Sequence, residues 1–474
     1  MKHLAIKPQQ LIFLSCLLLT VFSLSFTSCK KDSFITSPDA ILGIPSDALK
    51  FDTVFTSVGS VTQSFKINNG NNQKLLLSSV KLMGGTASAF KININGIAAQ
   101  EQTNIELAAN DSMYVFVSVQ INPNLDNLPF IVKDSIQVSY NGNTRFVQLE
   151  AYGQNANFLR NRVITGNTTW NNNLPYIILD RVRIDTNASL SIQPGCRIYS
   201  HANAPFLVDG TLIINGTREE PVTFAGDRLD EAYKDLPASW PGIYFRSTSN
   251  SNVLHFTTVK NAYQAIVAEN PADNAQPKVI LHQCIIDNAY DAGLLCINSS
   301  LFADNSLISN CGSNISFILG GDYNLTNCTV AAYSAHISHK NPVLSANNFA
   351  MINGSTVTNT LNATFTNCIF WGEEGFVTDE LVISQQGSNF VPAKFNNCLY
   401  RAMNDPANST IVNCIKNQPP LFDSVNVSKR IFDFHTSNPL APGIDNGIAT
   451  GLLKDLDNNN RSVGPTDIGC YEKQ

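Results

Sequence analysis

The chain has 474 residues, of which 43% are hydrophobic and 14% are charged, and its formal net charge is -6. This apolar content is sufficient for a packed core and excludes a wholly disordered chain. The mild acidity lacks the basic patch that nucleic-acid binding requires, and the length predicts about three domains, or two with one of them elongated. Asparagine makes up roughly one residue in nine. Because asparagine disfavours helix interiors and favours turns, we do not expect a mainly helical enzyme.

Residues 1–28 have the pattern of a secretory signal peptide. Lys2 and Lys7 precede an apolar run at residues 11–26, and small residues then lead to Cys29. A positive segment, an apolar segment and a small-residue cleavage site are the three parts of such a signal. The apolar run approaches the length of a membrane span, so an uncleaved membrane anchor is the alternative.

The tetrapeptide Phe26-Thr27-Ser28-Cys29 resembles the lipobox of bacterial lipoproteins, with Phe26 where leucine is usual. The resemblance implies that Cys29 is the lipid attachment site and the first mature residue, so that acyl chains bind the protein to a membrane. Lys30-Lys31-Asp32 resembles a weak form of the charged export signal of Bacteroidota surface lipoproteins. We therefore expect an outer membrane lipoprotein on the periplasmic or the cell-surface side.

Residues 29–48 are predicted to be a linker, and residues 49–153 a domain of short antiparallel strands. The segments of alternating polarity are residues 62–67, 74–82, 90–94, 112–120, 134–140 and 145–151. Asn141-Gly142 between two such segments is a strong hairpin signal. About seven strands in about 100 residues predict a β-sandwich. Residues 51–69 resemble the immunoglobulin-like repeats of surface proteins, which implies an immunoglobulin-like β-sandwich that acts as a spacer or contact module.

Residues 154–416 continue with short strands and Gly, Pro and Asn turns, without a helical period. The segments LSIQPG at 190–195, VDGTLIINGT at 208–217 and WPGIYF at 240–245 follow in that order. They resemble the first coils of right-handed parallel β-helix proteins. The resemblance implies a right-handed parallel β-helix over residues 154–416, and an all-β chain.

The later coils are visible as internal repeats. Leu254-His255 and Asn261-Ala262-Tyr263 recur 27 residues later as Leu281-His282 and Asn288-Ala289-Tyr290, a spacing typical of a solenoid. Asn261, Asn288 and Asn310 form a column in which stacked amides can bond between coils. About ten coils at about 4.8 Å each predict a rod of roughly 50 Å.

Eleven cysteines occur, and six of them follow Asn or Gln. Cys16 lies in the signal peptide and Cys29 is the predicted lipid site. The other nine are Cys196, Cys284, Cys296, Cys311, Cys328, Cys368, Cys398, Cys414 and Cys470. Nine is odd, so at least one stays unpaired within the chain, and their disulfide state is left open. The absence of a CxxC motif and the scattered histidines argue against zinc.

Four of these cysteines share a strand face with a large apolar residue two positions later. The pairs are Cys284 with Ile286, Cys328 with Val330, Cys368 with Phe370, and Cys398 with Tyr400. A small thiol in such a column needs only to pack, whereas a catalytic or metal-binding thiolate needs converging partners. We predict interior thiols.

Residues 417–474 resemble the C-terminal anchor segment of Bacteroidota β-helices, which implies a cap for the unpaired edge of the last coil. The segment DLDNNNR at 455–461 could suggest a calcium loop. An EF-hand needs Gly at its sixth position and Glu at its twelfth, and here these are Asn460 and Thr466. We therefore predict a structural turn, no metal site and no cofactor, and calcium has no support.

Candidate ligand-binding residues are confined to two insertions, before Trp240 and after Trp371. They are Asp227, Asp230, Glu231, Trp240, Trp371, Glu373 and Glu374. Enzymes on this fold bring paired carboxylates together on neighbouring coils. In the repeats Asp287 aligns with Lys260 and Ser309, and no two acids share a column, so we assign no catalytic residue.

Two functions remain. The favoured one is a non-enzymatic binding or structural protein of the cell envelope, with a polysaccharide or another envelope protein as partner and no nucleic acid. The alternative is a polysaccharide lyase or glycoside hydrolase, because fold alone does not determine function.

Overall fold

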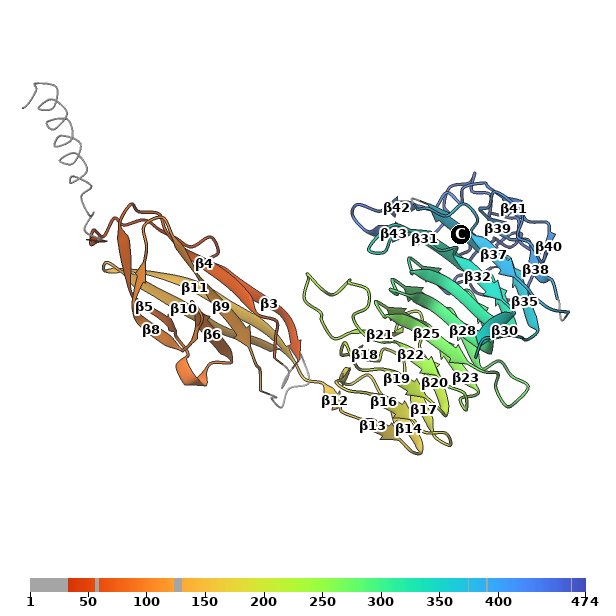
Figure 1. Ribbon diagram of the computed structural model, residues 1–474, viewed down its shortest axis with the longest axis horizontal. Coiled ribbons are helices and arrows are strands. Elements are labelled where there is room, and N and C mark those ends of the chain that lie inside the picture. The colour runs from red at the N-terminus through yellow and green to blue at the C-terminus, as the bar shows by residue number, and fades with distance from the viewer. Residues whose placement is uncertain (1–32, 56–58, 123–129, 374, 389–390, 462) are drawn as a thin grey trace, which may run out of the picture. The chain divides into compact units, whose positions relative to one another are not determined.

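The computed structural model describes residues 33–474 except 56–58, 123–129, 374, 389–390 and 462. The predicted signal peptide and Cys29 lie outside the described residues. The described residues are nearly all β, and the chain divides into two compact units, one made mainly of residues up to Ala151 and one that continues from Tyr152 to Gln474 (Figure 1). The described residues include no helix long and apolar enough to cross a membrane. Antiparallel sheets precede a parallel β-helix, which confirms the predicted fold class.

The first unit consists of two mainly antiparallel sheets. One sheet contains β1 (Phe34–Ile35), β5 (Lys74–Leu82), β10 (Phe130–Tyr140), β11 (Asn143–Gln154), β3 (Ala48–Phe55) and β8 (Glu101–Leu107). The other contains β2 (Leu42–Gly43), β4 (Gln63–Asn69), β9 (Ser112–Val119), β6 (Phe90–Ile94) and β7 (Ile97–Ala98), with a 3₁₀ turn at Gly85–Ala87 before β6. Buried residues alternate along β5 and β9, and the rings of Phe51 and Phe90 lie 5.9 Å apart across the two sheets. This is the packing of a β-sandwich.

Residues 34–43, which the sequence assigns to a linker at residues 29–48, contain two short strands. β1 pairs in parallel with β5, and β2 pairs antiparallel with β4. The Asn71 side chain bonds both the N–H and the carbonyl of Ile41 at 2.9 Å, and the Asn141 amide donates to the carbonyls of Ile35 and Ser37 at 2.9 Å. Two-residue strands are too short to show alternation, so these long-range contacts have no local sequence signal.

The β-helix of the second unit contains an 11-stranded parallel sheet with one strand for each coil. Its strands are β12 (Asn157–Leu159), β15 (Tyr176–Ile178), β18 (Arg197–Ser200), β21 (Val222–Gly226), β24 (Thr257–Lys260), β27 (Ile285–Asp287), β29 (Leu307–Ser309), β31 (Thr329–Tyr333), β36 (Ile369–Glu373), β39 (Leu399–Tyr400) and β41 (Ile415–Lys416). At about 4.8 Å per rung these coils span about 50 Å of the β-helix axis.

The other faces of the β-helix form a 17-stranded sheet. Its strands are β13 (Arg162–Ile164), β14 (Asn167–Trp170), β16 (Val182–Ile184), β17 (Ser189–Ile192), β19 (Phe206–Val208), β20 (Thr211–Asn215), β22 (Ile243–Phe245), β23 (Asn252–His255), β25 (Gln264–Glu269), β26 (Val279–His282), β28 (Ala292–Asp304), β30 (Ser313–Thr326), β32 (Leu344–Asn347), β35 (Leu361–Thr366), β37 (Leu381–Ser384), β38 (Ala393–Asn396) and β40 (Ser409–Val412). Two parallel stacks run through this sheet, and they fuse in the long strands β28 and β30. A hairpin of β33 (Phe349–Ile352) and β34 (Ser355–Thr358) projects between β32 and β35.

The predicted thiol column lies in the interior. Cys284, Cys328, Cys368 and Cys398 are free, at most 1% exposed, and belong to the core that runs through the β-helix. The residue before each of them turns the corner with a left-handed φ of 50–53°, a conformation that asparagine tolerates. The expectation of interior thiols is confirmed for these four positions.

The C-terminal segment packs along the outer face of the 11-stranded sheet. It begins with a hairpin of β42 (Ser424–Asn426) and β43 (Ile431–Asp433). Its apolar side chains Phe434, Leu456, Ile468 and Cys470 form a second core with Leu307, Ala331, Ile369 and Leu399. The segment reaches back to Gln283, whose Nε2 donates to the carbonyl of Asp455 at 2.7 Å.

The sequence predicts a cap over the last edge, and the contacts of the described segment extend along the side of several coils. The physical reason is the apolar outer face of β29, β31, β36 and β39, which would otherwise be exposed. The predicted turn at 455–461 is confirmed, because the Asp455 carboxylate accepts the backbone N–H groups of Asn459 at 2.7 Å and Glu472 at 3.0 Å.

Candidate polar pocket on the asparagine column

Asn261, Asn288 and Asn310 follow β24, β27 and β29 directly, and each has a left-handed φ of 52–62°. The Nδ2 group of Asn288 donates to Oδ1 of Asn261 at 2.8 Å, so the predicted bonding between coils is present for this pair. Asn261 and Asn288 also donate to the carbonyls of Lys234 and Asp235, at 2.7 and 2.8 Å. The column thereby fixes the insertion before Trp240 against the sheet.

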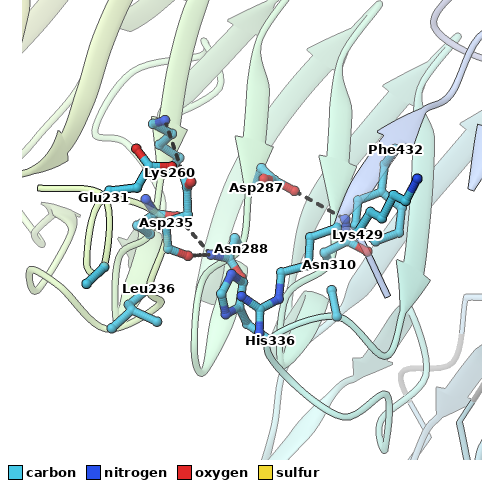
Figure 2. A pocket seen from close by; sticks show the side chains of 14 residues that line it. Glu231, Asp235, Leu236, Lys260, Asp287, Asn288, Asn310, His336, Lys429 and Phe432 are labelled. Atoms are coloured by element: carbon cyan, nitrogen blue, oxygen red, sulfur yellow. Dashed lines mark hydrogen bonds and ion pairs between the residues drawn. The ribbon is translucent and has the colours of Figure 1, made fainter. Parts of the chain in front are cut away.

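A pocket of about 400 Å³ lies over this column, within the size range of small-molecule sites. Its walls are the insertion on one side, the loop after β31, and the turn of the β42–β43 hairpin (Figure 2). The lining residues are Glu231, Ala232, Asp235, Leu236, Lys260, Asn261, Asp287, Asn288, Asn310, Ala335, His336, Lys429, Arg430 and Phe432. We call this site the asparagine pocket.

The asparagine pocket contains charges of both signs. Lys260 and Asp287 occupy the same register on β24 and β27, as the repeat alignment predicts, and Lys260 Nζ lies 3.9 Å from Asp235 Oδ1. Glu231 adds a third acid, and Lys429 and Arg430 add two further cations from the hairpin turn. The three acids balance the three cations, so a ligand can meet both donors and acceptors.

Asp287 lies at the centre of the labelled residues in Figure 2. Its Oδ1 accepts the hydroxyl of Ser309 at 2.6 Å and the amide of Asn310 at 3.5 Å. Burial raises the pKa of Asp287, and its hydrogen bonds and Lys260 offset only part of that effect. Burial and then the charge of Arg430 lower the pKa of His336, which favours a neutral imidazole at pH 7.

Asn288 presents a buried acceptor without a donor. Its Nδ2 group faces two acceptors, Oδ1 of Asn261 and the carbonyl of Asp235, and this fixes the orientation of the amide. Among the described residues no donor then reaches Oδ1, although the side chain belongs to a residue only 6% exposed. An unsatisfied buried acceptor costs about 1–3 kcal/mol.

Of the acids predicted to bind ligand in the first insertion, the structure places only Glu231 at the pocket. The carboxylate of Asp227 lies 2.7 Å from Nδ1 of His201, and burial raises the pKa of Asp227. Asp230 accepts two bonds from Arg228 at 2.8 and 3.1 Å. Both side chains therefore stabilise the insertion itself.

The two tryptophans predicted in the possible ligand loops have buried side chains. Trp240 is 0% exposed and donates from Nε1 to the carbonyl of Lys260 at 2.9 Å. Trp371 is 3% exposed, packs against the C-terminal segment, and donates to Glu373 at 2.8 Å. Large aromatic side chains contribute most when buried, and this outweighs the position of both residues beside insertions. Glu374 lies outside the described residues.

Sequence reasoning missed Lys429, Arg430, Phe432 and His336 as pocket residues. They reach the pocket from the C-terminal hairpin and from the loop after β31. Both segments lie outside the aligned repeats, so the repeat spacing does not relate them to β27. The asparagine column, in contrast, was visible in the sequence and could have marked the floor of the pocket.

Other buried ionisable groups have partners within the chain. The Lys278 ammonium donates to the carbonyls of Arg246 and Ser247 at 2.9 Å, and burial lowers its pKa to about 8. Nε2 of His339 lies 2.9 Å from Glu380, and both side chains are at most 1% exposed. In both arrangements the ionisable group has its hydrogen-bond partners within the chain, which indicates a structural role. Within the described residues no group of three or more His, Cys, Asp or Glu side chains is arranged to hold a metal ion.

A second pocket of about 440 Å³ lies in the β-sandwich over β6, β7 and β9. Its lining is Thr62, Lys91, Ile92, Asn93, Gly96, Ala98, Phe116 and Ser118. With one charged residue it offers fewer directional contacts than the asparagine pocket, which we therefore take as the candidate site.

Comparison with known proteins gives no family. No protein-family model and no curated protein matches the chain. Among solved structures, a protein of unknown function from Porphyromonas gingivalis W83 is 14% identical over 27% of this chain and 50% of its own, with a TM-score of 0.19. A PapD-like domain of human CEP192 is 13% identical over 26% of this chain and 92% of its own, also with a TM-score of 0.19. Similarity at this level supports no inference about function.

Proposed function

We propose that this chain is an exported envelope lipoprotein that binds carbohydrate in the asparagine pocket without cleaving it. The observation that carries the proposal is a polar pocket whose lining combines three acids, three cations and the side chains of three asparagines. A sugar hydroxyl donates and accepts hydrogen bonds, so one hydroxyl can bond an acid and a cation of this lining at the same time.

The remaining lining supports the same ligand class. Lys260, Lys429 and Arg430 can donate to hydroxyl, ring or carboxylate oxygens, and Glu231 and Asp235 can accept from hydroxyls. Phe432 from the hairpin and His336 from the loop after β31 add flat rings to the lining. Small-molecule sites characteristically combine a few polar groups with aromatic or other apolar side chains.

The cellular context rests on sequence resemblance. The lipobox-like tetrapeptide supports lipidation at Cys29, and the charged residues after it support a Bacteroidota outer membrane lipoprotein. The β-sandwich is then an immunoglobulin-like spacer or contact module beside the β-helix.

The test is a panel of immobilised neutral and acidic polysaccharides, probed with the full mature chain. We expect at least one polysaccharide to retain the protein, and Arg430→Ala to weaken retention, because Arg430 lines the pocket on an exposed turn. Lys394→Ala removes an exposed cation from β38, outside the pocket lining, and should leave retention unchanged. Retention that is equal in both variants would place binding elsewhere.

A second candidate is a polysaccharide lyase or glycoside hydrolase that uses the same pocket. The observation in its favour is that Asp287, whose pKa burial raises, lines the pocket together with Asp235 and Lys260, since two carboxyl groups in one site can act as acid and base. Reducing ends and the ultraviolet absorbance of unsaturated products should be followed with calcium present. Turnover that is lost in Asp287→Asn but kept in Asp230→Asn would establish the enzyme, because Asp230 is paired with Arg228 away from the pocket.

A further inference from the structure

Cys398 and Cys414 occupy the same position in the last two coils. β39 and β41 pair in parallel, with Leu399 opposite Ile415 and Tyr400 opposite Lys416, so the cysteines just before them lie on adjacent rungs. The backbone N–H of Cys398 donates to Sγ of Cys414 at 3.3 Å. Rungs about 4.8 Å apart fall within the Cα separations that disulfides span.

The thiol column changes from fully buried to accessible at this end. Cys328, Cys368 and Cys398 are 0% exposed, whereas Cys414 is the one cysteine among the described residues that is not fully buried. Burial raises the pKa of Cys398 well above its usual range. Hydrogen bonding from Cys398 outweighs burial at Cys414 and lowers its pKa to about 7. Cys414 is therefore the thiol that an oxidant can reach and that ionises readily.

The last coil has no further coil beyond it. β41 contains two half-buried residues and lies at the end of its sheet, and β40 ends the other sheet in the same way. A small shift that brings the two sulfurs to bonding distance is therefore not opposed by another coil on the far side. Cys368, in contrast, lies between coils on both sides.

We propose that Cys398 and Cys414 form a reversible disulfide that cross-links the last two coils of the β-helix. The oxidant is a small disulfide such as oxidised glutathione. The Cys414 thiolate attacks one of its sulfurs and releases one thiolate, and the Cys398 thiolate then attacks the Cys414 sulfur and releases the second. Two protein thiols lose two protons and two electrons, and the oxidant is reduced to two thiols.

The experiment compares the full mature chain incubated with oxidised glutathione and with dithiothreitol. Free thiols are alkylated, and the protein is digested with trypsin without reduction. Cleavage after Lys394, Arg401 and Lys416 puts Cys398 in peptide 395–401 and Cys414 in peptide 402–416, each as its only cysteine. We expect a linked mass of these two peptides after oxidation and both peptides alkylated after reduction and unfolding.

Two variants serve as controls. Cys414→Ser should abolish the linked mass, and it should retain the fold because the side chain is only partly buried. Cys196→Ser changes a buried cysteine of an early coil and should leave the link intact. Oxidation should raise the thermal midpoint of the wild type and leave that of Cys414→Ser unchanged. If Cys414 instead carries glutathione, or bonds a second chain, while Cys398 is recovered alkylated, the proposal is wrong.

Discussion

Asparagine serves both the fold and the candidate site because its side chain suits a left-handed corner. Asn327, Asn367 and Asn397 turn the chain before the interior thiols, and Asn288 and Asn310 turn it at the pocket, all with φ near 50–56°. At such corners most residues pay a steric cost, which asparagine offsets by bonding nearby backbone groups. At Asn288 the amide that shapes the corner also bonds the insertion that forms one wall of the pocket.

The interior thiols lead to a stability prediction. Cys328→Ala should lower the free energy of unfolding by on the order of 1 kcal/mol, because a small cavity replaces the sulfur. Cys328→Asp should cost several kcal/mol, since the site is 0% exposed and offers no partner for a charge. Urea unfolding measures both values. An aspartate variant as stable as the alanine variant would show that position 328 is not interior.

At the scale of elements, the spacing of the internal repeats predicted which residues stack between successive coils. It did not predict which insertions and hairpins pack against the outside of the coils. The register Lys260–Asp287–Ser309 agrees with the sequence alignment, because stacked coils repeat the same phase. The β42–β43 hairpin is not part of the internal repeats, so its position beside the insertion could not be predicted from the local sequence pattern. The strands β1 and β2 were not predicted for a related reason: their partner strands are distant in sequence.

The C-terminal segment contains a histidine held between two carboxylates. Nδ1 of His435 lies 2.5 Å from Asp433 and Nε2 lies 2.7 Å from Asp457, and Arg218, from the loop after β20, also reaches Asp457 at 2.8 Å. Because carboxylates only accept, both ring nitrogens donate and the ring is charged. Partial burial alone would lower the pKa of His435, but the two carboxylates outweigh it and raise the pKa.

This arrangement predicts a pH dependence with a definite sign. A pKa raised in the folded state stabilises the fold fully below the unfolded value of about 6.5, and the contribution is lost as pH rises through the folded pKa. The unfolding free energy of the wild type should therefore fall more between pH 6 and pH 9 than that of His435→Gln. Parallel pH profiles of the two proteins, measured by urea unfolding, would contradict the prediction.

At the scale of the whole molecule, the sequence predicted an all-β chain in which a sandwich precedes a β-helix, and the structure agrees. Two features made this possible: strong alternation within the sandwich strands, and landmarks that recur in fixed order in the first coils. The asparagine pocket was not predicted as a site, since it forms only where an insertion, a loop and a hairpin from different parts of the chain meet.

Membrane attachment remains a prediction from the N-terminal residues. Cys29→Ala should abolish incorporation of a radiolabelled or clickable fatty acid, because the acceptor thiol and the cleavage site are lost. The wild type should carry label and partition with membranes. A soluble, unlabelled wild-type protein would reject lipidation.

The central claim, that the asparagine pocket binds carbohydrate, is tested most directly by titration calorimetry with a variant of Asn288, which lines the pocket and bonds the insertion that forms one wall. The ligand is an oligosaccharide from the best-retained polysaccharide, and the proteins are the wild type, Asn288→Ala, and Asn404→Ala as an exposed control. We predict that Asn288→Ala weakens binding about tenfold or more, equivalent to about 1.4 kcal/mol, while Asn404→Ala matches the wild type. Equal affinities for all three proteins, with Asn288→Ala folded, would contradict the account.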